Sequence, residues 1–184
     1  MPRADAIFLH GTSSSGKTTL AKAFQRAMPE PTLYVSNDNF IFMAADHVLK
    51  DEKLFPKVLF PLLSAFHKSL PIVAACGFPM VIDHVIENDE WMDEVAGALK
   101  GHRIYFVKVS CPLEELERRE QARGDRRIGQ ARWQLGRVHG FCGYDVEVDT
   151  HCSTVDQNVQ QLVDLIYSGA EPTALAEYRT KRLG

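Results

Sequence analysis

Short apolar runs alternate along this chain with longer stretches in which apolar residues recur every three or four positions. The runs predict strands at residues 6–10, 32–36, 80–82 (closing on Asp83), 103–110 and 145–149. The longer stretches predict helices at residues 18–28, 55–76, 89–99, from 112 onward and at 155–167. Strands that alternate with helices of this length are typical of an α/β protein with a parallel sheet covered on both sides.

Proline and capping residues indicate where these helices break and begin. Pro61 and Pro71 predict two interruptions in the segment 55–76, because proline lacks the N–H group that a helix interior uses. Asn88 or Asp89 is suited to cap the helix that follows, since a short polar side chain can accept from the first free N–H groups.

Length and composition fit one globular domain. No repeat or linker divides the sequence, so we expect residues 1–184 to form a single domain, with the tail 169–184 either a docked helix or a frayed end. The 21 Lys and Arg against 24 Asp and Glu give a net charge of −3, which argues against a nucleic-acid or membrane-surface binder. The four scattered cysteines form no zinc-like pair and suit a reducing compartment. The apolar run near Met1 is too short for a signal peptide, so we expect a cytoplasmic protein, and a homo-oligomer is compatible with these data.

The clearest motif is G-x-x-x-x-G-K-[ST] at residues 11–18, between a predicted strand and a predicted helix. Its glycines permit the backbone angles and close approach that let N–H groups surround a phosphate. The start of the next helix adds free N–H groups and a positive dipole end. Lys17 is expected to reach the β- and γ-phosphates and the Thr18 hydroxyl to face Mg²⁺. The predicted contacts to ATP are Gly11, Thr12, Ser13, Ser14, Ser15, Gly16, Lys17, Thr18 and Thr19, together with Arg119 and Arg123.

Missing motifs narrow the class of nucleotide-binding protein. There is no N-K-x-D guanine-reading motif and no D-x-x-G switch after the third predicted strand, which argues against a signalling GTPase. A chain of 184 residues is also too short for a motor or transporter ATPase module. Small kinases remain.

Two aspartates follow predicted strands at the edge of the sheet where ligands of α/β proteins gather. Asp38 comes after the second strand and is expected to accept the proton of the acceptor hydroxyl; it could instead cap a helix that begins at Asn39. Asp83 ends the third strand and is expected to hold Mg²⁺ directly or through water and to touch the acceptor, or else to be structural. We expect His84 to be an ordinary semi-buried histidine.

A basic segment near residues 112–140 predicts a lid over the triphosphate. Its seven arginines are 118, 119, 123, 126, 127, 132 and 137, against the acids Glu120 and Asp125. Arg119, Arg123 and Arg126 have helical spacing, and Arg123 with Arg126 or Arg127 is expected to contact phosphate during catalysis. The alternative is a solvated helix face paired with Glu114, Glu115 and Glu117.

Four stretches together resemble one family. They are G-T-S-S-S-G-K at 11–17, P-E-P at 29–31 before a strand ending at Asp38, A-R-G-D-R at 122–126 and Y-D-V-E-V-D-T at 144–150. Over about residues 6–168 the sequence resembles the chloramphenicol phosphotransferase family of small P-loop kinases. The resemblance implies a nucleotide-kinase-like three-layer α/β fold with a five-stranded parallel sheet, and transfer of the γ-phosphoryl group of ATP to an antibiotic hydroxyl. Asp38 falls where that family keeps its proposed general base.

The acceptor region departs from the family pattern, at residues 37–43 and 44–60. Phe40, Phe42, Met43 and Phe55 could wall an apolar acceptor pocket or simply be core. The resemblance leads us to expect chloramphenicol as the acceptor, and the departures leave open another hydroxylated antibiotic, such as a capuramycin-type nucleoside. A metabolic kinase of a nucleoside, nucleotide or shikimate-like acid, and a non-catalytic ATP-binding sensor, remain alternatives.

Overall fold

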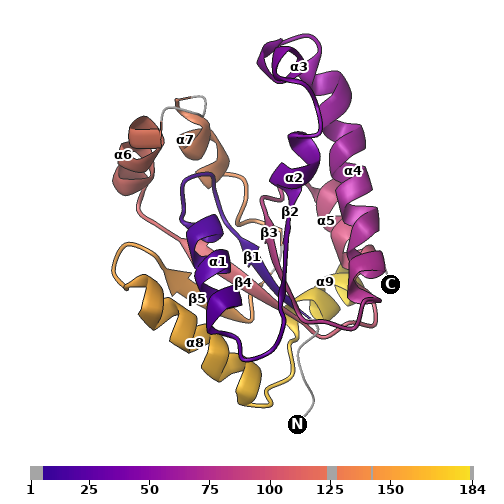
Figure 1. Ribbon diagram of the computed structural model, residues 1–184, viewed down its shortest axis with the longest axis vertical. Coiled ribbons are helices and arrows are strands. Elements are labelled where there is room, and N and C mark those ends of the chain that lie inside the picture. Colours follow the sequence, from indigo (N-terminus) through magenta and orange to yellow (C-terminus); the bar gives the residue numbers. More distant parts are fainter. Residues whose placement is uncertain (1–5, 124–127, 142, 183–184) are drawn as a thin grey trace.

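A parallel β-sheet forms the middle layer of the computed structural model, which describes residues 6–123, 128–141 and 143–182 (Figure 1). Its strands are β1 (Ala6–His10), β2 (Leu33–Ser36), β3 (Met80–His84), β4 (Ile104–Ser110) and β5 (Val146–Asp149). They lie in the order β2-β3-β1-β4-β5, and each neighbouring pair is parallel. The five-stranded parallel sheet is thus confirmed.

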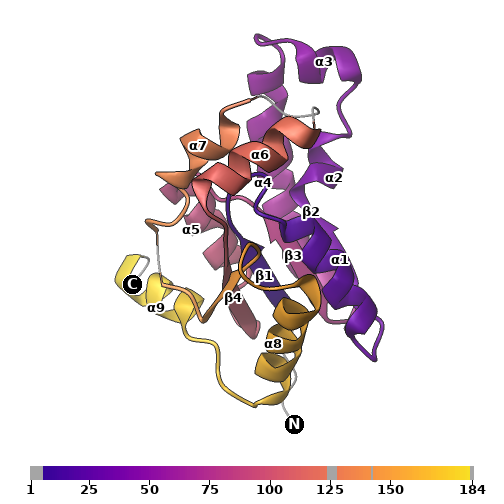
Figure 2. The same cartoon turned by 90° about the vertical axis from the view of Figure 1, so that its left-hand side faces the viewer.

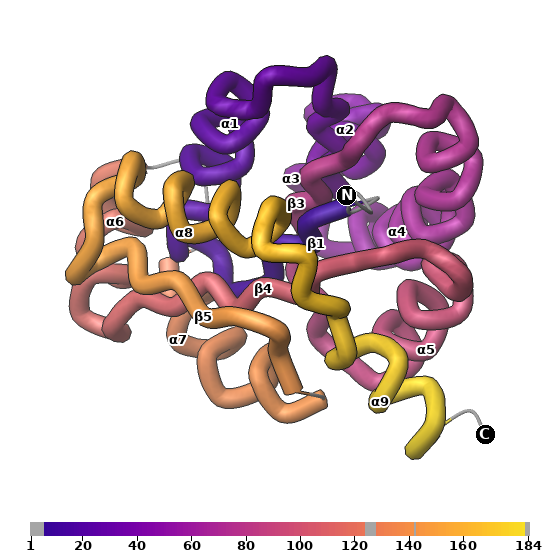
Figure 3. The backbone as a smooth tube through the Cα atoms, turned by 90° about the horizontal axis from the view of Figure 1, so that it is seen from below, coloured from indigo at the N-terminus to yellow at the C-terminus, as the bar shows by residue number. Residues whose placement is uncertain are grey.

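Helices cover both faces of this sheet. The helices in the described ranges are α1 (Lys17–Ala27), α2 (Asn37–Ile41), α3 (Asp46–Lys50), α4 (Phe55–Ala74), α5 (Asp89–Ala98), α6 (Leu113–Arg123), α7 (Gln130–Leu135), α8 (Val155–Tyr167) and α9 (Ala174–Arg182). Figure 3 shows α1 and α8 on one side of the strands and α4, α5 and α9 on the other. The three-layer sandwich is confirmed.

The alternation of side chains along β1 explains the two cores. Ile7 and Leu9 face α1 and α8, where they meet Leu20, Phe24 and Leu162. Ala6 and Phe8 face the opposite layer, whose buried side chains come mainly from α4, α5 and α9. Because both faces are covered, β1 and β4 are apolar over most of their length.

Strand register brings the predicted site residues to one edge of the sheet. Ser36 of β2 pairs with Asp83 of β3, and Asp83 pairs with Leu9 of β1. The chain that leaves β1 therefore passes beside Asp83, and the chain that leaves β2 begins α2 at the same edge. Figure 2 shows α6 and α7 lying together near this edge.

The long helix α4 corrects one prediction. It runs unbroken from Phe55 to Ala74 with Pro61 and Pro71 inside, so the predicted interruptions are wrong. Its buried side chains, which include Phe66 and Leu70, pack into the core of the sheet's second face, and this packing offsets the backbone hydrogen bonds that the prolines remove.

The structure also shows how α5 begins and what the C-terminal tail forms. Asn88 caps α5, since its side chain accepts from the backbone N–H of Trp91. The tail forms the docked helix α9, where the Tyr178 hydroxyl donates to Asp93 Oδ1 over 2.5 Å and Arg179 donates to the carbonyl of Ala96. None of the helices in the described ranges is long and apolar enough to cross a membrane.

Candidate active site

The loop between β1 and α1 needs glycine at both fixed positions, for two different reasons. A Cβ at Gly11 would lie 2.4 Å from the backbone oxygen of Val109 on β4, so no larger residue fits. Gly16 has φ 92°, a left-handed conformation that side chains disfavour, and it is the N-cap of α1. Gly11 thus allows the loop to lie against the backbone of β4, and Gly16 allows a left-handed backbone angle, whereas their approach to a phosphate stays a prediction.

The interior of this loop holds polar groups that suit an anionic ligand. Lys17 is only 6% exposed, and its ammonium group donates to the carbonyl of Thr12 over 2.7 Å. The hydroxyls of Ser14 and Ser15 are buried, and neither has a hydrogen-bond partner within the described residues. A buried hydroxyl without a partner is costly unless a ligand supplies one, and phosphate oxygens fit this position.

Asp83 and Thr18 meet beside the loop. Asp83 is 4% exposed, and its Oδ2 accepts from the Thr18 hydroxyl over 2.6 Å and from the Tyr34 hydroxyl over 3.1 Å. Burial and the neighbouring carboxylate raise the pKa of Tyr34 to about 12, so Tyr34 stays a proton donor. A carboxylate and a hydroxyl oxygen at the end of a phosphate loop are the ligand types that Mg²⁺ takes, with phosphates and water completing the shell.

No cluster of three or more His, Cys, Asp or Glu suited to a metal occurs in the part of the chain that the structure describes. The oxygens of Thr18 and Asp83 suit Mg²⁺ by ligand type, and their role in holding it stays a prediction.

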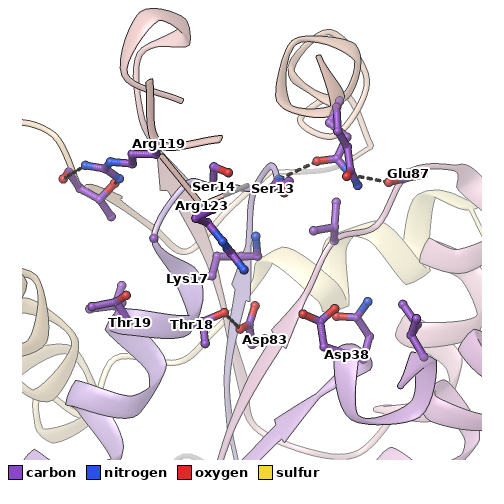
Figure 4. Close-up of a pocket in the computed structure, with 18 of the residues that line it drawn as sticks. Ser13, Ser14, Lys17, Thr18, Thr19, Asp38, Asp83, Glu87, Arg119 and Arg123 are labelled. Carbon is purple, nitrogen blue, oxygen red and sulfur yellow. Dashed lines mark hydrogen bonds between the residues drawn. The ribbon is translucent and has the colours of Figure 1, made fainter. Parts of the chain in front are cut away.

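The phosphate loop opens into one cavity of about 680 Å³ (Figure 4). One part is lined by Gly16, Lys17, Thr18, Thr19, Arg118, Arg119, Arg123, Thr150, Ser153, Val155 and Asn158. The other is lined by Asn37, Asp38, Ile41, Phe55, Leu59, Leu63, Val85, Glu87 and Trp91. A cavity of this size is within the range of small-molecule sites.

Asp38 lies in the first turn of α2 and lines the cavity. Ser36 is the N-cap of this helix and accepts from the backbone N–H of Asp38 over 3.3 Å, so the alternative in which Asp38 caps a helix from Asn39 is wrong. Figure 4 shows the side chains of Asp38 and Asp83 in the same region of the cavity.

The arginines of the predicted lid divide between pairing and the cavity. Arg118 pairs with Glu115 and Arg132 with Glu117, as the solvated-face alternative predicts. Arg123, at the end of α6, lines the cavity and extends toward Lys17 (Figure 4). Arg126 and Arg127 lie outside the described residues.

Arg119, like Arg118, both pairs with an acidic residue and lines the cavity. It pairs with Glu115, and its guanidinium donates to the backbone and side-chain oxygens of Thr150 over 2.9 and 3.1 Å. The Thr150 hydroxyl in turn donates to the carbonyl of Ser15 over 2.7 Å. These contacts fasten α6 to the phosphate loop through the turn after β5.

The predicted apolar wall is only partly correct. Phe40 packs against Phe66 in the core, and Phe42 and Met43 are 62% and 72% exposed and do not line the cavity, whereas Phe55 does. The wall is instead built from Phe55, Leu59 and Leu63 of α4, with Ile41, Val85 and Trp91. The helical spacing of the three α4 residues is a signal that could have identified them.

Sequence reasoning missed Gln134 and Glu87, which link the lid to the phosphate loop. The backbone N–H of Ser13 donates to Gln134 Oε1 over 2.6 Å, and Gln134 Nε2 donates to Glu87 Oε1 over 2.5 Å. Burial raises the pKa of Glu87, against the opposing effect of this hydrogen bond. The link joins residues 121 and 47 positions apart, and no local pattern indicates it.

His84 is fully buried in the second core and points away from the reacting groups. Its Nε2 lies 2.9 Å from Nε2 of His67, whose Nδ1 meets Glu94 over 2.6 Å. Burial holds the pKa of His84 well below its ordinary value, so the ring is neutral. The structure places it in the core, more deeply than the sequence suggested.

Comparison with known proteins agrees with this geometry. A protein of Mycobacterium tuberculosis strain H37Rv named "Putative O-phosphotransferase Rv2636" is 29% identical over 205 residues, and the match covers 100% of this chain and 91% of that protein. The M. tuberculosis APS kinase has a similar fold, with 18% identity, a TM-score of 0.67 and coverage of 91% of this chain and 99% of that one. The Deinococcus radiodurans tunicamycin resistance protein has 15% identity, a TM-score of 0.67 and coverage of 89% and 96%.

The parallel sheet and the loop after β1 give this chain the fold that P-loop kinases have. A family model described as chloramphenicol phosphotransferase-like protein matches residues 4–166, and the chain belongs to that family. Family and fold together make it an ATP-dependent phosphotransferase with a hydroxyl acceptor.

Proposed function

We propose that this enzyme phosphorylates a hydroxyl group of a small, largely apolar antibiotic, and thereby confers resistance to it. Chloramphenicol and other hydroxylated antibiotics, such as capuramycin-type nucleosides, are the acceptors to test. The observation that carries the proposal is that Asp38 and the phosphate loop line one cavity, which the apolar side chains of Phe55, Leu59, Leu63 and Trp91 line as well. An apolar wall with few polar groups is typical of a small-molecule pocket.

Three described polar residues of the cavity, Asp38, Lys17 and Arg123, have a part in the proposed transfer. Asp38 accepts the proton of the acceptor hydroxyl, whose oxygen forms a bond to the γ-phosphorus while the bond from that phosphorus to the β–γ bridging oxygen breaks and ADP leaves. Lys17 and Arg123 hold the negative charge of the phosphoryl group, and the loop N–H groups orient the triphosphate. Arg126 and Arg127 are proposed as further phosphate contacts.

Mg²⁺ is the proposed cofactor. Thr18 and Asp83 would hold it, since their oxygens lie 2.6 Å apart beside the loop. Bound there, Mg²⁺ would neutralise charge on the β- and γ-phosphoryl oxygens.

ADP release from Mg-ATP, measured across a panel of hydroxylated antibiotics, nucleosides, nucleoside monophosphates and shikimate, tests the proposal. Turnover confined to an antibiotic is the expected result. Turnover of a metabolite alone would replace the proposal with a metabolic kinase, and ATP binding without any turnover would favour the sensor.

The Asp38→Asn variant separates chemistry from binding. A lost general base lowers turnover by ~10²-fold or more, while ATP affinity should change little because Asp38 belongs to α2 and not to the phosphate loop. Asp46→Asn is the matched control, since Asp46 is exposed on α3 and does not line the cavity. Full activity of Asp38→Asn would contradict the assignment.

A further inference from the structure

Charge is unevenly distributed around the cavity. The basic residues that line it in the described ranges are Lys17, Arg118, Arg119 and Arg123, from the first turn of α1 and from α6. The acidic ones are Asp38, Asp83 and Glu87, which follow or end the strands β2 and β3. Figure 4 shows Asp38 and Glu87 on one side of the cavity and Arg119 on the other.

Glu87 is the carboxylate that neither the phosphate loop nor the proposed mechanism uses. It stands in the short connection between β3 and α5, just before the cap Asn88, and lines the cavity with Val85 and Trp91. Gln134 occupies Glu87 Oε1, whereas Oε2 takes no hydrogen bond from any residue that the structure describes. One oxygen is thus fixed and the other can accept from a ligand.

The partner of Glu87 is itself rigid. Gln134 is 1% exposed, and its amide oxygen is held by the backbone N–H of Ser13. Its orientation is therefore set by the phosphate loop, and the Glu87 carboxylate is placed relative to the transferring phosphoryl group. Such preorganisation is what a recognition residue needs in order to select a ligand.

Arg137, a cation that acts on Glu87, does not make the Glu87 side of the cavity positively charged. Arg137 acts on Glu87 electrostatically, but its guanidinium lies over the ring of Trp133 at 4.4 Å from the centroid and does not line the cavity. A carboxylate or phosphate of an acceptor beside Glu87 would meet a like charge and no lining cation among the described residues of that end.

We propose that Glu87 determines acceptor specificity: its Oε2 accepts a hydrogen bond from a second O–H or N–H group of the acceptor while Asp38 receives the reacting hydroxyl. The acceptor is then an uncharged or cationic molecule with at least two hydrogen-bond donors and an apolar body, and anionic metabolites are rejected. This inference rests on the proposed function, whose acceptor class it narrows.

The experiment compares acceptors in pairs that differ in charge. Adenosine and adenosine 5′-monophosphate, gluconamide and gluconate, and methyl shikimate and shikimate are offered together with chloramphenicol, and ADP release is measured with wild type, Glu87→Gln and Glu87→Lys. The neutral member of each pair that reacts is expected to have the higher kcat/KM. The matched control is Glu90→Gln, since Glu90 is exposed on α5 and does not line the cavity.

If Glu87 recognises the acceptor, its substitution should change the acceptor KM and leave kcat nearly unchanged. Glu87→Gln should raise the acceptor KM by about tenfold, as for the loss of one charge-assisted hydrogen bond, and leave the KM for ATP and kcat within about twofold. Glu87→Lys should shift the preference toward the anionic members. A preference of wild type for anionic acceptors, or an unchanged acceptor KM in Glu87→Gln, would overturn the inference while leaving the proposed function in place. No turnover of any compound would overturn the proposed function and the inference together.

Discussion

The Thr18 hydroxyl donates to Asp83 Oδ2 over 2.6 Å, and so the first turn of α1 is joined to the end of β3. The two residues lie 65 positions apart, and Tyr34 from β2 adds a third group to the same oxygen. Three elements of the sheet edge thus meet at one carboxylate.

Asp83→Asn tests the proposed Mg²⁺ role of this carboxylate. The amide keeps the shape but removes the charge, so the Mg²⁺ concentration for half-maximal activity should rise by about tenfold or more. The measurement is ADP release against Mg²⁺ concentration at saturating ATP. A curve identical to that of wild type would exclude Asp83 from the metal site.

Lys17→Ala should weaken both ATP binding and turnover. Its charge meets phosphate in the ground state and in the transition state, so both KM for ATP and kcat are expected to change. Calorimetric titration with a non-hydrolysable ATP analogue, together with steady-state kinetics, measures the two effects. The control is Lys22→Ala, since Lys22 is on α1 but does not line the cavity. Unchanged kinetics in Lys17→Ala would count against the phosphate loop itself.

Gly11→Ala should destabilise the fold. The added Cβ would lie 2.4 Å from a backbone oxygen of β4, which cannot move without disturbing the sheet, and overpacking of this kind costs about 1–3 kcal/mol. The free energy of unfolding in urea measures this. Gly136→Ala is the matched control, because a Cβ there has nothing within 4 Å and the backbone is right-handed helical. Equal stability of the two variants would refute the packing argument.

Buried His10 predicts that the protein loses stability in mild acid. Burial lowers the pKa of His10 to about 3 from an ordinary 6.5, and its ring nitrogens lie 2.8 Å from the Tyr144 hydroxyl and 3.2 Å from the carbonyl of Ile86. Between these pKa values the unfolded chain binds a proton that the folded chain refuses. The free energy of unfolding should therefore fall as pH drops below 6.5, by up to about 1.4 kcal/mol per pH unit from this residue.

Denaturant titrations between pH 7 and pH 5 check the slope. His10→Gln removes the titrating group and should flatten the dependence, and the same substitution at the exposed His151 is the control. An unchanged slope in His10→Gln would show that other groups dominate.

Local spacing predicted the parts of the site that local physics governs. The glycines at 11 and 16, Lys17 and Thr18 are fixed by a loop of a few residues, and the carboxyl ends of parallel strands explain why Asp38 and Asp83 reach the same cavity. The roles of these residues in catalysis and metal binding stay predictions.

Tertiary contacts determine the features that the sequence did not predict. Pro61 stays inside α4 because that helix is packed along its length, and Phe42 and Met43 turn to solvent although their neighbour Ile41 faces the cavity. Gln134 of α7 contacts Ser13 of the phosphate loop, although the two residues lie 121 positions apart in the sequence. Periodicity within one element carries no information on such pairings.

The two parts of the cavity differ in how freely they can evolve. Gly11 is closed to substitution by the backbone of β4, and Gly16 by its own conformation. The apolar wall comes largely from Phe55, Leu59 and Leu63 of α4, and of these Phe55 and Leu59 are only partly buried. A few substitutions in this one helix would therefore change which acceptor fits the cavity, while the loop that binds ATP in the proposed function stays the same.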